Sequence, residues 1–353
     1  MVRLKDICDV DWGDTNLTKQ AYVENGKYLG VSAGGCDGRM DYYDFEAYTP
    51  VISAIGANCG KMFLPEEPFV AIKNTITLKP HKDILGKYIF YALNSNKIPH
   101  RGGGQPFISK TDTEEYMIIC PSLEEQTRIV TIFDKICKII DMRHNQLSKL
   151  DELVKSRFVE LFVDKDFPKT TIGELVASKV SSVKKVFLPT DTIKYIDISS
   201  IDNKRNIMTG FTEYVLEDAP SRAQQHIRKG DIVVSTVRPN LKNVAITGYD
   251  YDNLVASSGF CVLRAEKCLP SYLMAVVCSD DFTDAMTKVV TGANYPAIKD
   301  SDVKNYVVPN PPVELQEQFA AFVEQIDKSK FEIQKSLEKL ETLKKALIQK
   351  YFG

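Results

Sequence analysis

The chain has 353 residues, of which 44% are hydrophobic and 26% charged, with both signs mixed. This composition excludes a disordered or fibrous protein, and the length favours two or three domains with buried cores. The formal net charge of −2 is low for a DNA-binding protein, and neither half is basic overall: residues 1–120 carry 13 basic and 15 acidic side chains, and residues 167–310 carry 17 and 16, so any basic surface must be local.

The first 120 residues combine short β-like runs with a helical patch. The runs at 48–55 and 69–78 are bounded by Gly, Asn and Pro, and residues 84–94 have apolar side chains at helical spacing. From Pro121 onward, apolar residues recur every three or four positions from Leu123 to Phe158, with charges on the other faces. We therefore expect an α+β domain over 1–120 and one long amphipathic helix within 121–166.

The second half of the chain follows the same plan. Residues 167–310 contain β-like runs at 231–237 and 259–263 and a helical patch at 272–287. From Pro312 at a helix start, apolar residues from Phe319 to Tyr351 have near-heptad spacing. We expect a second α+β domain, followed by a long helix within 311–353.

Both long helices need a partner for their apolar faces. A helix of about 40 residues is roughly 60 Å long, more than a small domain covers. We therefore expect the two helices to pack on each other as an antiparallel coiled coil between the two domains, which gives the chain two-fold pseudosymmetry. The alternative is two unrelated surface helices, each packed on its own domain.

An internal repeat supports this organisation. Residues 104–112 match 294–302 at an offset of 190, and 121–126 match 311–316 at the same offset. Upstream the offset shrinks: residues 28–32 resemble 195–199 at 167, and Leu4 with Ile7 resembles Ile172 with Leu175 at 168. The chain thus reads as domain, helix, domain, helix, with an insertion in the second half.

This arrangement, with the Pro-x-x-Glu-x-Gln entry at 121–126 and the Leu-x-x-x-x-Phe-x-x-x-Phe close at 153–162, resembles the specificity (S) subunit of type I restriction-modification systems. The resemblance covers nearly the whole chain. It implies a non-catalytic subunit whose two target-recognition domains each read one half of a split duplex DNA site. Because the two domains differ in sequence, the half-sites should differ too, giving an asymmetric target. A pseudo-two-fold protein also suits the pseudo-two-fold backbone of a duplex.

The resemblance also implies partners. The subunit would bind two copies of an adenine methyltransferase and, through them, a translocating endonuclease subunit. The assembled complex would methylate adenine N6 and cut DNA at the expense of ATP. The methyl donor and ATP would bind the partners, so this chain needs no cofactor.

Candidate DNA contacts come from matched polar segments of the two halves. Glycine-bearing segments at 101–105 and 291–295 would let backbone amides approach phosphate, and segments 58–61 and 238–243 supply the Arg, Lys and Asn chemistry that reads base edges. A flexible loop or an ordinary hairpin turn would use the same residue types. Weaker pairs are Lys73 and Asn74 with Ser257 and Ser258, and Ser32 with Ser199. The expected DNA-binding residues are Ser32, Asn58, Lys61, Lys73, Asn74, Arg101, Gln105, Ser199, Arg238, Asn240, Lys242, Asn243, Ser257, Asn294 and Tyr295.

Two alternatives remain. The fragment Asn310-Pro-Pro-Val313 resembles the Asn-Pro-Pro-aromatic motif of adenine methyltransferases, but Val313 replaces the stacking aromatic and no methyl-donor glycine motif precedes it. A coiled-coil scaffold that does not read DNA would suit the near-neutral charge.

The sequence offers little for other chemistry. The eight cysteines are scattered without zinc-site spacing, so we expect no metal site and a core role for the thiols. The four histidines pair with no obvious nucleophile, so we expect no catalytic residues. No apolar run reaches the roughly 18 residues of a membrane span, which predicts a cytoplasmic protein without membrane contact.

Overall fold

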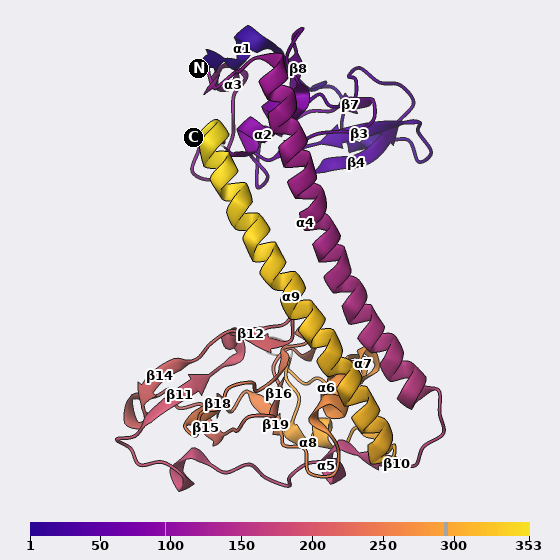
Figure 1. Ribbon diagram of the computed structural model, residues 1–353, viewed down its shortest axis with the longest axis vertical. Coiled ribbons are helices and arrows are strands. Elements are labelled where there is room, and N and C mark those ends of the chain that lie inside the picture. Colours follow the sequence, from indigo (N-terminus) through magenta and orange to yellow (C-terminus); the bar gives the residue numbers. More distant parts are fainter. Residues whose placement is uncertain (96, 293–295) are drawn as a thin grey trace. The chain divides into compact units, whose positions relative to one another are not determined.

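The computed structural model describes residues 1–95, 97–292 and 296–353 and forms two compact units. Unit 1 contains Met1–Asn145 and Ile333–Gly353, and unit 2 contains Gln146–Glu332. The two long helices, α4 (Leu123–Phe158) and α9 (Val313–Phe352), each contribute one part to either unit (Figure 1). The mixture of helices and short strands confirms the expected α+β class.

Unit 1 carries two small sheets and the separate two-stranded pair β1-β9. A four-stranded antiparallel sheet has the order β2-β8-β5-β6, and a three-stranded sheet has the order β4-β3-β7, with β3 and β7 parallel. The elements are β1 Val2–Arg3, α1 Leu4–Ile7, β2 Cys8–Trp12, β3 Tyr28–Ser32, β4 Gly35–Met40, β5 Val51–Ser53, β6 Met62–Phe63, β7 Phe69–Ala71, β8 Thr75–Pro80, α2 Gly86–Ser95, α3 Lys110–Glu114 and β9 Met117–Ile118.

Unit 2 repeats this plan with more strands. Its sheets have the orders β14-β11-β18-β15 and β17-β16-β19, and the pairs β12-β13 and β10-β20 stand apart. The elements are β10 Lys169–Thr171, α5 Ile172–Leu175, β11 Thr192–Ile196, β12 Ile201–Asp202, β13 Ile207–Met208, β14 Thr212–Val215, β15 Ala223–His226, β16 Ile232–Ser235, β17 Val244–Ile246, β18 Leu254–Ser257, β19 Phe260–Leu263, α6 Pro270–Cys278, α7 Asp280–Lys288, α8 Asp300–Lys304 and β20 Val307–Pro309.

Backbone contacts confirm the repeat and correct part of its register. Leu4 N donates to Tyr116 O at 2.9 Å, and Ile172 N donates to Tyr306 O at 3.0 Å, so the offsets of 168 and 190 hold. The expected offset of 167 for strand β3 is wrong. Gly30 pairs with Val70 in parallel register, and Tyr195 pairs with Val255 in the same way in unit 2. Gly30 therefore corresponds to Tyr195, and the offset for this strand is 165.

The strand correction changes two matched pairs. At the offset of 165, Ser32 corresponds to Asp197 rather than to Ser199. After strand β7 of unit 1, Asn74 O accepts a hydrogen bond from Ala54 N, and after strand β18 of unit 2, Gly259 O accepts one from Thr236 N, both at 2.9 Å. Asn74 therefore corresponds to Gly259, one residue beyond the expected Ser258. Non-local pairing sets these registers, and strands of three to five residues carry too little pattern to reveal it.

A buried glutamine fastens each long helix to its unit. Gln126 Oε1 accepts from Leu85 N at 3.0 Å, and its Nε2 donates to Pro121 O at 3.0 Å. Gln316 makes the corresponding bonds, at 2.8 Å from Leu269 N and 2.9 Å to Pro311 O. The Gln of the Pro-x-x-Glu-x-Gln entry thus satisfies backbone groups that burial would otherwise leave without partners.

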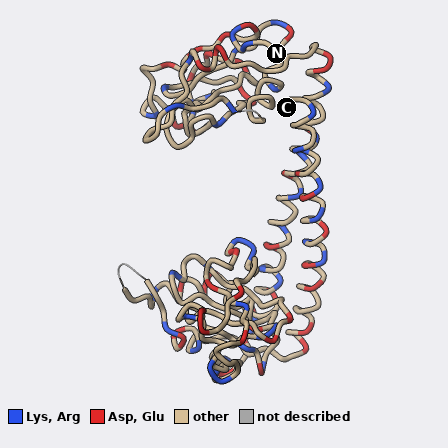
Figure 2. Tube along the Cα trace, turned by 90° about the vertical axis from the view of Figure 1, so that its left-hand side faces the viewer, with Lys and Arg blue, Asp and Glu red and all other residues tan. Residues whose placement is uncertain are grey.

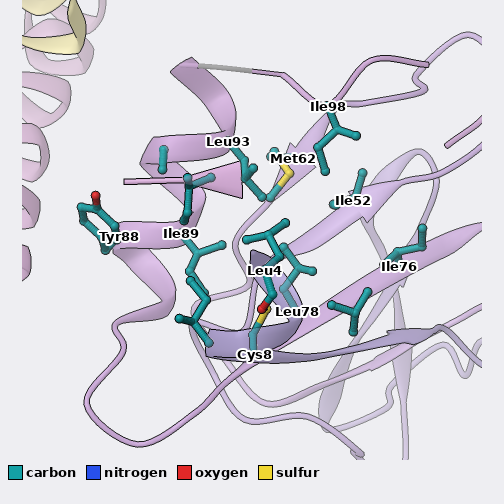
Figure 3. Packing of buried hydrophobic residues seen from close by; sticks show 14 of the residues in the cluster. Leu4, Cys8, Ile52, Met62, Ile76, Leu78, Tyr88, Ile89, Leu93 and Ile98 are labelled. Carbon is teal, nitrogen blue, oxygen red and sulfur yellow. The ribbon is translucent and has the colours of Figure 1, made fainter. Parts of the chain in front are cut away.

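The core of unit 1 closes around the far end of α9. Leu4, Ile52, Leu78 and Ile89 point toward one another from strands and helices (Figure 3), and Tyr88 and Phe352 belong to the same cluster. The Phe352 ring lies 5.7 Å from Tyr88 and 5.5 Å from Phe133 on α4. The first part of α4 and the last part of α9 are therefore antiparallel partners within unit 1.

Unit 2 closes in the same way around the end of α4. The helix continues through a wider turn, Val159–Val163, which brings Phe162 to 5.0 Å from Tyr272 and 5.4 Å from Phe319 on α9. Phe162 and Phe352 are matched at the offset of 190, and each is at most 5% exposed. The core of unit 1 thus contains the start of α4 and the end of α9, and the core of unit 2 contains the start of α9 and the end of α4.

Four expectations need correction. The helical patch 272–287 is two helices, because Ser279 is extended and its hydroxyl accepts from Phe282 N at 3.2 Å to cap α7. The run 69–78 is two strands, divided at Asn74 with a φ of +68°. Leu123, Leu153 and Leu343 of the expected apolar faces are exposed, since a paired helix buries only a narrow stripe. Cys36 is exposed, although Cys8 and Cys261 are buried as expected.

Among the described residues, no helix is long and apolar enough to cross a membrane.

Candidate nucleic-acid interface

Three loops of unit 1 meet beside a short strand-like segment at Phe107. Phe107 forms bridges with both Ile55 and Arg101, and Gly56 N donates to Pro106 O at 2.9 Å. The bond from Ala54 N to Asn74 O, at 2.9 Å, adds the turn after β7. The loops 56–61, 73–74 and 101–107 therefore share one place in the fold, which we call loop junction 1.

Unit 2 has the same junction, contact for contact. Ala297 forms bridges with Val237 and Thr291, and Arg238 N donates to Pro296 O at 2.9 Å. Thr236 N donates to Gly259 O at 2.9 Å. The loops 238–243 and 257–259 and the segment at 291 and 297 form loop junction 2. Residues 293–295 lie outside the described residues, so the candidates Asn294 and Tyr295 have no described place.

The structure brings most candidate residues of unit 1 together and exposes them. Asn58, Lys61, Lys73, Asn74, Arg101 and Gln105 all lie on loop junction 1 with exposed side chains. Their chemistry combines three cations with three amides, the groups that bind phosphate oxygens and the edges of guanine and adenine.

Loop junction 2 presents a different set. Arg238 and Asn240 are exposed, while Lys242 and Asn243 are half-buried. Of the candidate pairs, Asn58 and Asn240 occupy matched positions, and Lys61 matches Asn243. The backbone frame is therefore repeated while the side chains on it differ.

Local acidic groups balance part of the positive charge. Arg101 pairs with Asp112, and Lys242 pairs with Asp280 at the start of α7. The Ser109 hydroxyl and backbone, together with Arg101, lower the pKa of Asp112. Because the Arg101 side chain remains 66% exposed, its guanidinium can exchange this carboxylate for another anion. Lys and Arg are interspersed with Asp and Glu throughout both units (Figure 2).

The three serine candidates are engaged in local structure. Ser32 is 4% exposed, and its hydroxyl donates to Asp37 at 2.7 Å and accepts from Gly34 N at 3.0 Å. Ser257 is 2% exposed and accepts from Gly259 N at 3.2 Å. Ser199 is exposed, but it donates to Asp197 at 2.6 Å. None of the three lies on its junction as an open hydroxyl.

Sequence reasoning missed a hairpin that supports loop junction 2. Asn203, in the turn between β12 and β13, donates to Leu241 O at 2.8 Å, and Asn206 donates to Val244 O at 3.2 Å. Between residues 197 and 236 the offset that relates unit 2 to unit 1 grows from 165 to 182. The hairpin therefore belongs to the insertion in unit 2, and unit 1 lacks it. The asparagines at 203 and 206 were the available signal, but their partners are about 38 residues away.

The described residues contain no group of three or more His, Cys, Asp or Glu side chains that could hold a metal ion. The Asn310-Pro-Pro-Val313 fragment joins β20 to α9, and Asn310 N donates to Pro168 O at 2.8 Å. It therefore forms the entry to a helix, as the repeat predicts, and Val313 opens that helix.

Known proteins share both the sequence pattern and the fold. A family model for the type I restriction modification DNA specificity domain matches residues 1–152 and 165–345. The type I restriction enzyme MjaVIII specificity subunit of Methanocaldococcus jannaschii is 26% identical over 83% of this chain and 75% of its own length. The EcoDI specificity subunit of Escherichia coli is 21% identical over 97% of this chain and 88% of its own.

Solved structures with the same fold cover almost the whole chain. The crystal structure of the type I restriction-modification S subunit from M. genitalium superimposes with a TM-score of 0.65 at 17% identity, covering 100% of this chain and 95% of that one. A chain from a study of complex assembly and conformational transition in a type I restriction-modification system gives 0.55 at 15% identity, covering 99% and 96%. The family model spans both halves of the duplicated chain, and the chain therefore belongs to the family of type I restriction-modification DNA specificity subunits, which are non-catalytic.

Proposed function

We propose that this subunit recognises a bipartite, asymmetric duplex DNA target, with loop junction 1 contacting one half-site and loop junction 2 the other. The observation that carries the proposal is the repetition of one backbone frame with different exposed side chains. The same bonds, from Gly56 N to Pro106 O and from Arg238 N to Pro296 O, hold the two junctions. Equal frames present their loops alike, and different Arg, Lys and Asn sets select different bases.

The recognition domains proposed here are residues 1–120 and 167–310, with spacers at 121–166 and 311–353. The DNA-contacting residues are the exposed members of the two junctions, together with Asn294 and Tyr295 beyond the described residues. The serines at 32, 199 and 257 shape the loops around them. Because a spacer of paired helices has a fixed length, it would set the number of base pairs between the half-sites.

We further propose that the subunit positions two adenine methyltransferase subunits and, through them, an endonuclease subunit. Exposed apolar side chains on the long helices support protein partners: Met142 is 54% exposed, Phe331 66% and Leu343 48%. In unit 2, Phe331, Val323 and Ala320 line an open groove of about 560 Å³ on α9. The methyl donor and ATP would bind the partners, so the chain itself would carry no cofactor.

The test is genome-wide mapping of methylated adenines in cells that express the chain with the methyltransferase encoded beside it. We expect methylation at a split motif that disappears without this chain. Replacing residues 1–120 by the corresponding domain of a relative should change one half of the motif and leave the other half and the spacing intact.

A smaller change gives the same information if the exchanged domain misfolds. The double variant R101A/Q105A alters only exposed side chains and should relax the same half-motif. Methylation that does not depend on the chain, or a motif that survives both changes, would contradict DNA reading and leave a scaffold that binds protein partners.

A further inference from the structure

The loop 56–60 and its counterpart 238–242 have the same length and share two backbone hydrogen bonds. Ser53 N donates to Lys61 O at 2.8 Å, and Ser235 N donates to Asn243 O at 2.9 Å. Within the loops, the bonds from Cys59 N to Gly56 O and from Leu241 N to Arg238 O are both 2.9 Å. A single offset of 182 therefore relates the two loops residue by residue.

Both ends of this loop require a left-handed backbone. In unit 1 the two positions are glycines, with φ of +87° at Gly56 and +81° at Gly60. In unit 2 the matched positions are Arg238 at +50° and Lys242 at +51°. Side chains with a Cβ adopt this region at a cost in free energy that glycine avoids, and Arg and Lys are not among the residues that tolerate it best.

Crowding does not account for the glycines of unit 1. A Cβ built on Gly56 meets no described atom within 4 Å, and one on Gly60 meets only Ile108 Cδ1 at 3.6 Å. The backbone dihedral alone therefore favours glycine at both positions. Strained non-glycine residues persist where the side chain has a role that outweighs the strain.

The two strained residues differ in what their side chains do. Lys242 is half-buried and pairs with Asp280, which ties the loop to the start of α7. The bond from Asn203 Nδ2 to Leu241 O, at 2.8 Å, holds the loop from its other side. Arg238 is exposed, and its own N–H is bonded to Pro296 O. The loop is thus fixed at several points and carries one exposed guanidinium.

We propose that Arg238 is a specificity-determining residue of the second recognition domain, whose guanidinium binds the O6 and N7 edge of a guanine in the second half-site. Lys242 is a positioning residue that holds the loop. The inference rests on the proposed function. A contact with a DNA phosphate needs only a positive charge near the DNA backbone, and many unstrained positions in the protein can supply one. A base edge needs a fixed direction, and a rigid loop with one strained arginine supplies it.

The first domain should read its half-site from another loop of the junction. The residue of the first domain that matches Arg238 is Gly56, which has no side chain. The arginine of loop junction 1 is Arg101, which pairs with Phe107 on the side opposite to Ile55. Arg101 in turn matches Thr291 of the second domain. Each domain therefore places its arginine on a different one of two neighbouring loops, so the same frame would fit two different base sequences.

The experiment compares R238G, R238A and R228A in the complex with the methyltransferase. Gly relieves the dihedral and removes the side chain, Ala keeps the strain without the guanidinium, and Arg228 is an exposed arginine of the same domain with no positive φ. We expect R238G to raise the thermal midpoint by about 2–4 °C over R238A. Both variants at 238 should lose the requirement for one guanine in the second half-motif, and R228A should retain it.

Other outcomes decide the question as clearly. A second half-motif unchanged in R238G would overturn the inference while leaving the proposed function intact, because wild type would still methylate a split site. Uniformly weaker methylation with the motif preserved would assign Arg238 to phosphate, against the proposal. Equal midpoints for R238G and R238A would remove the strain argument. If the wild-type chain supported no methylation that depends on its presence, the proposed function itself would be rejected.

Discussion

Gln316 provides the sharpest test of how the long helices are fastened. The residue is 2% exposed in the first turn of α9 and satisfies one backbone donor, Leu269 N, and one backbone acceptor, Pro311 O. In Gln316→Ala both groups lose their partner. An unsatisfied buried group costs about 1–3 kcal/mol. Since Leu269 is only half-buried, we expect a total loss of about 2–4 kcal/mol in the free energy of unfolding.

Urea unfolding followed by circular dichroism measures this loss. The matched control is Gln318→Ala, two residues further along the same helix on an exposed position, which should change the midpoint little. Gln126→Ala removes the corresponding bonds in unit 1 and should lower the stability by a similar amount. A midpoint for Gln316→Ala no lower than that of Gln318→Ala would refute the idea that these glutamines anchor the helices.

Three further outcomes follow from the structure. Phe352→Ala should lower the stability of unit 1 by about 3–5 kcal/mol, because the ring is 5% exposed within a packed aromatic cluster, and calorimetry measures this. Arg264→Ala should cost about 3 kcal/mol in a urea titration, since it leaves the buried Asp231 carboxylate without its ion pair. The pKa of Asp112 is lowered in the folded protein, chiefly by the hydrogen bond from the Ser109 hydroxyl. The ionised carboxylate therefore stabilises the fold fully above the unfolded-state pKa of about 3.9, and this stabilisation is lost as the pH falls through the lower folded-state pKa. The urea midpoint of Asp112→Asn should therefore vary less between pH 5 and pH 3 than that of wild type.

Each of these predictions has its own control. Leu343→Ala removes a side chain that is 48% exposed on the same helix as Phe352 and should cost far less. Adding Asp231→Asn to Arg264→Ala should recover part of the lost stability, because it removes the unpaired charge. An equal acid dependence of Asp112→Asn and wild type would show that this carboxyl makes no net contribution.

The sequence alone was sufficient for the features that repeat over many residues. Apolar spacing predicted both long helices, because periodicity over about 40 positions leaves no alternative period. The offset of 190 predicted the duplicated domain-helix plan and the matched glutamines at 126 and 316. The β-like runs that precede the polar loops 58–61 and 238–243 indicated that these loops lie at equivalent points, which the shared bonds confirm.

Only the tertiary structure decided the features that depend on contacts between distant segments. The register of β3 against β7 rests on hydrogen bonds across about 40 residues, so the sequence of such short strands could not reveal that Ser32 matches Asp197. The hydroxyl of Ser32 is used by Asp37, and the backbone of Arg238 is left-handed, because the surrounding frame imposes both. A residue type reports what a side chain can do, whereas the packed frame decides which side chains remain exposed and in what direction they are held.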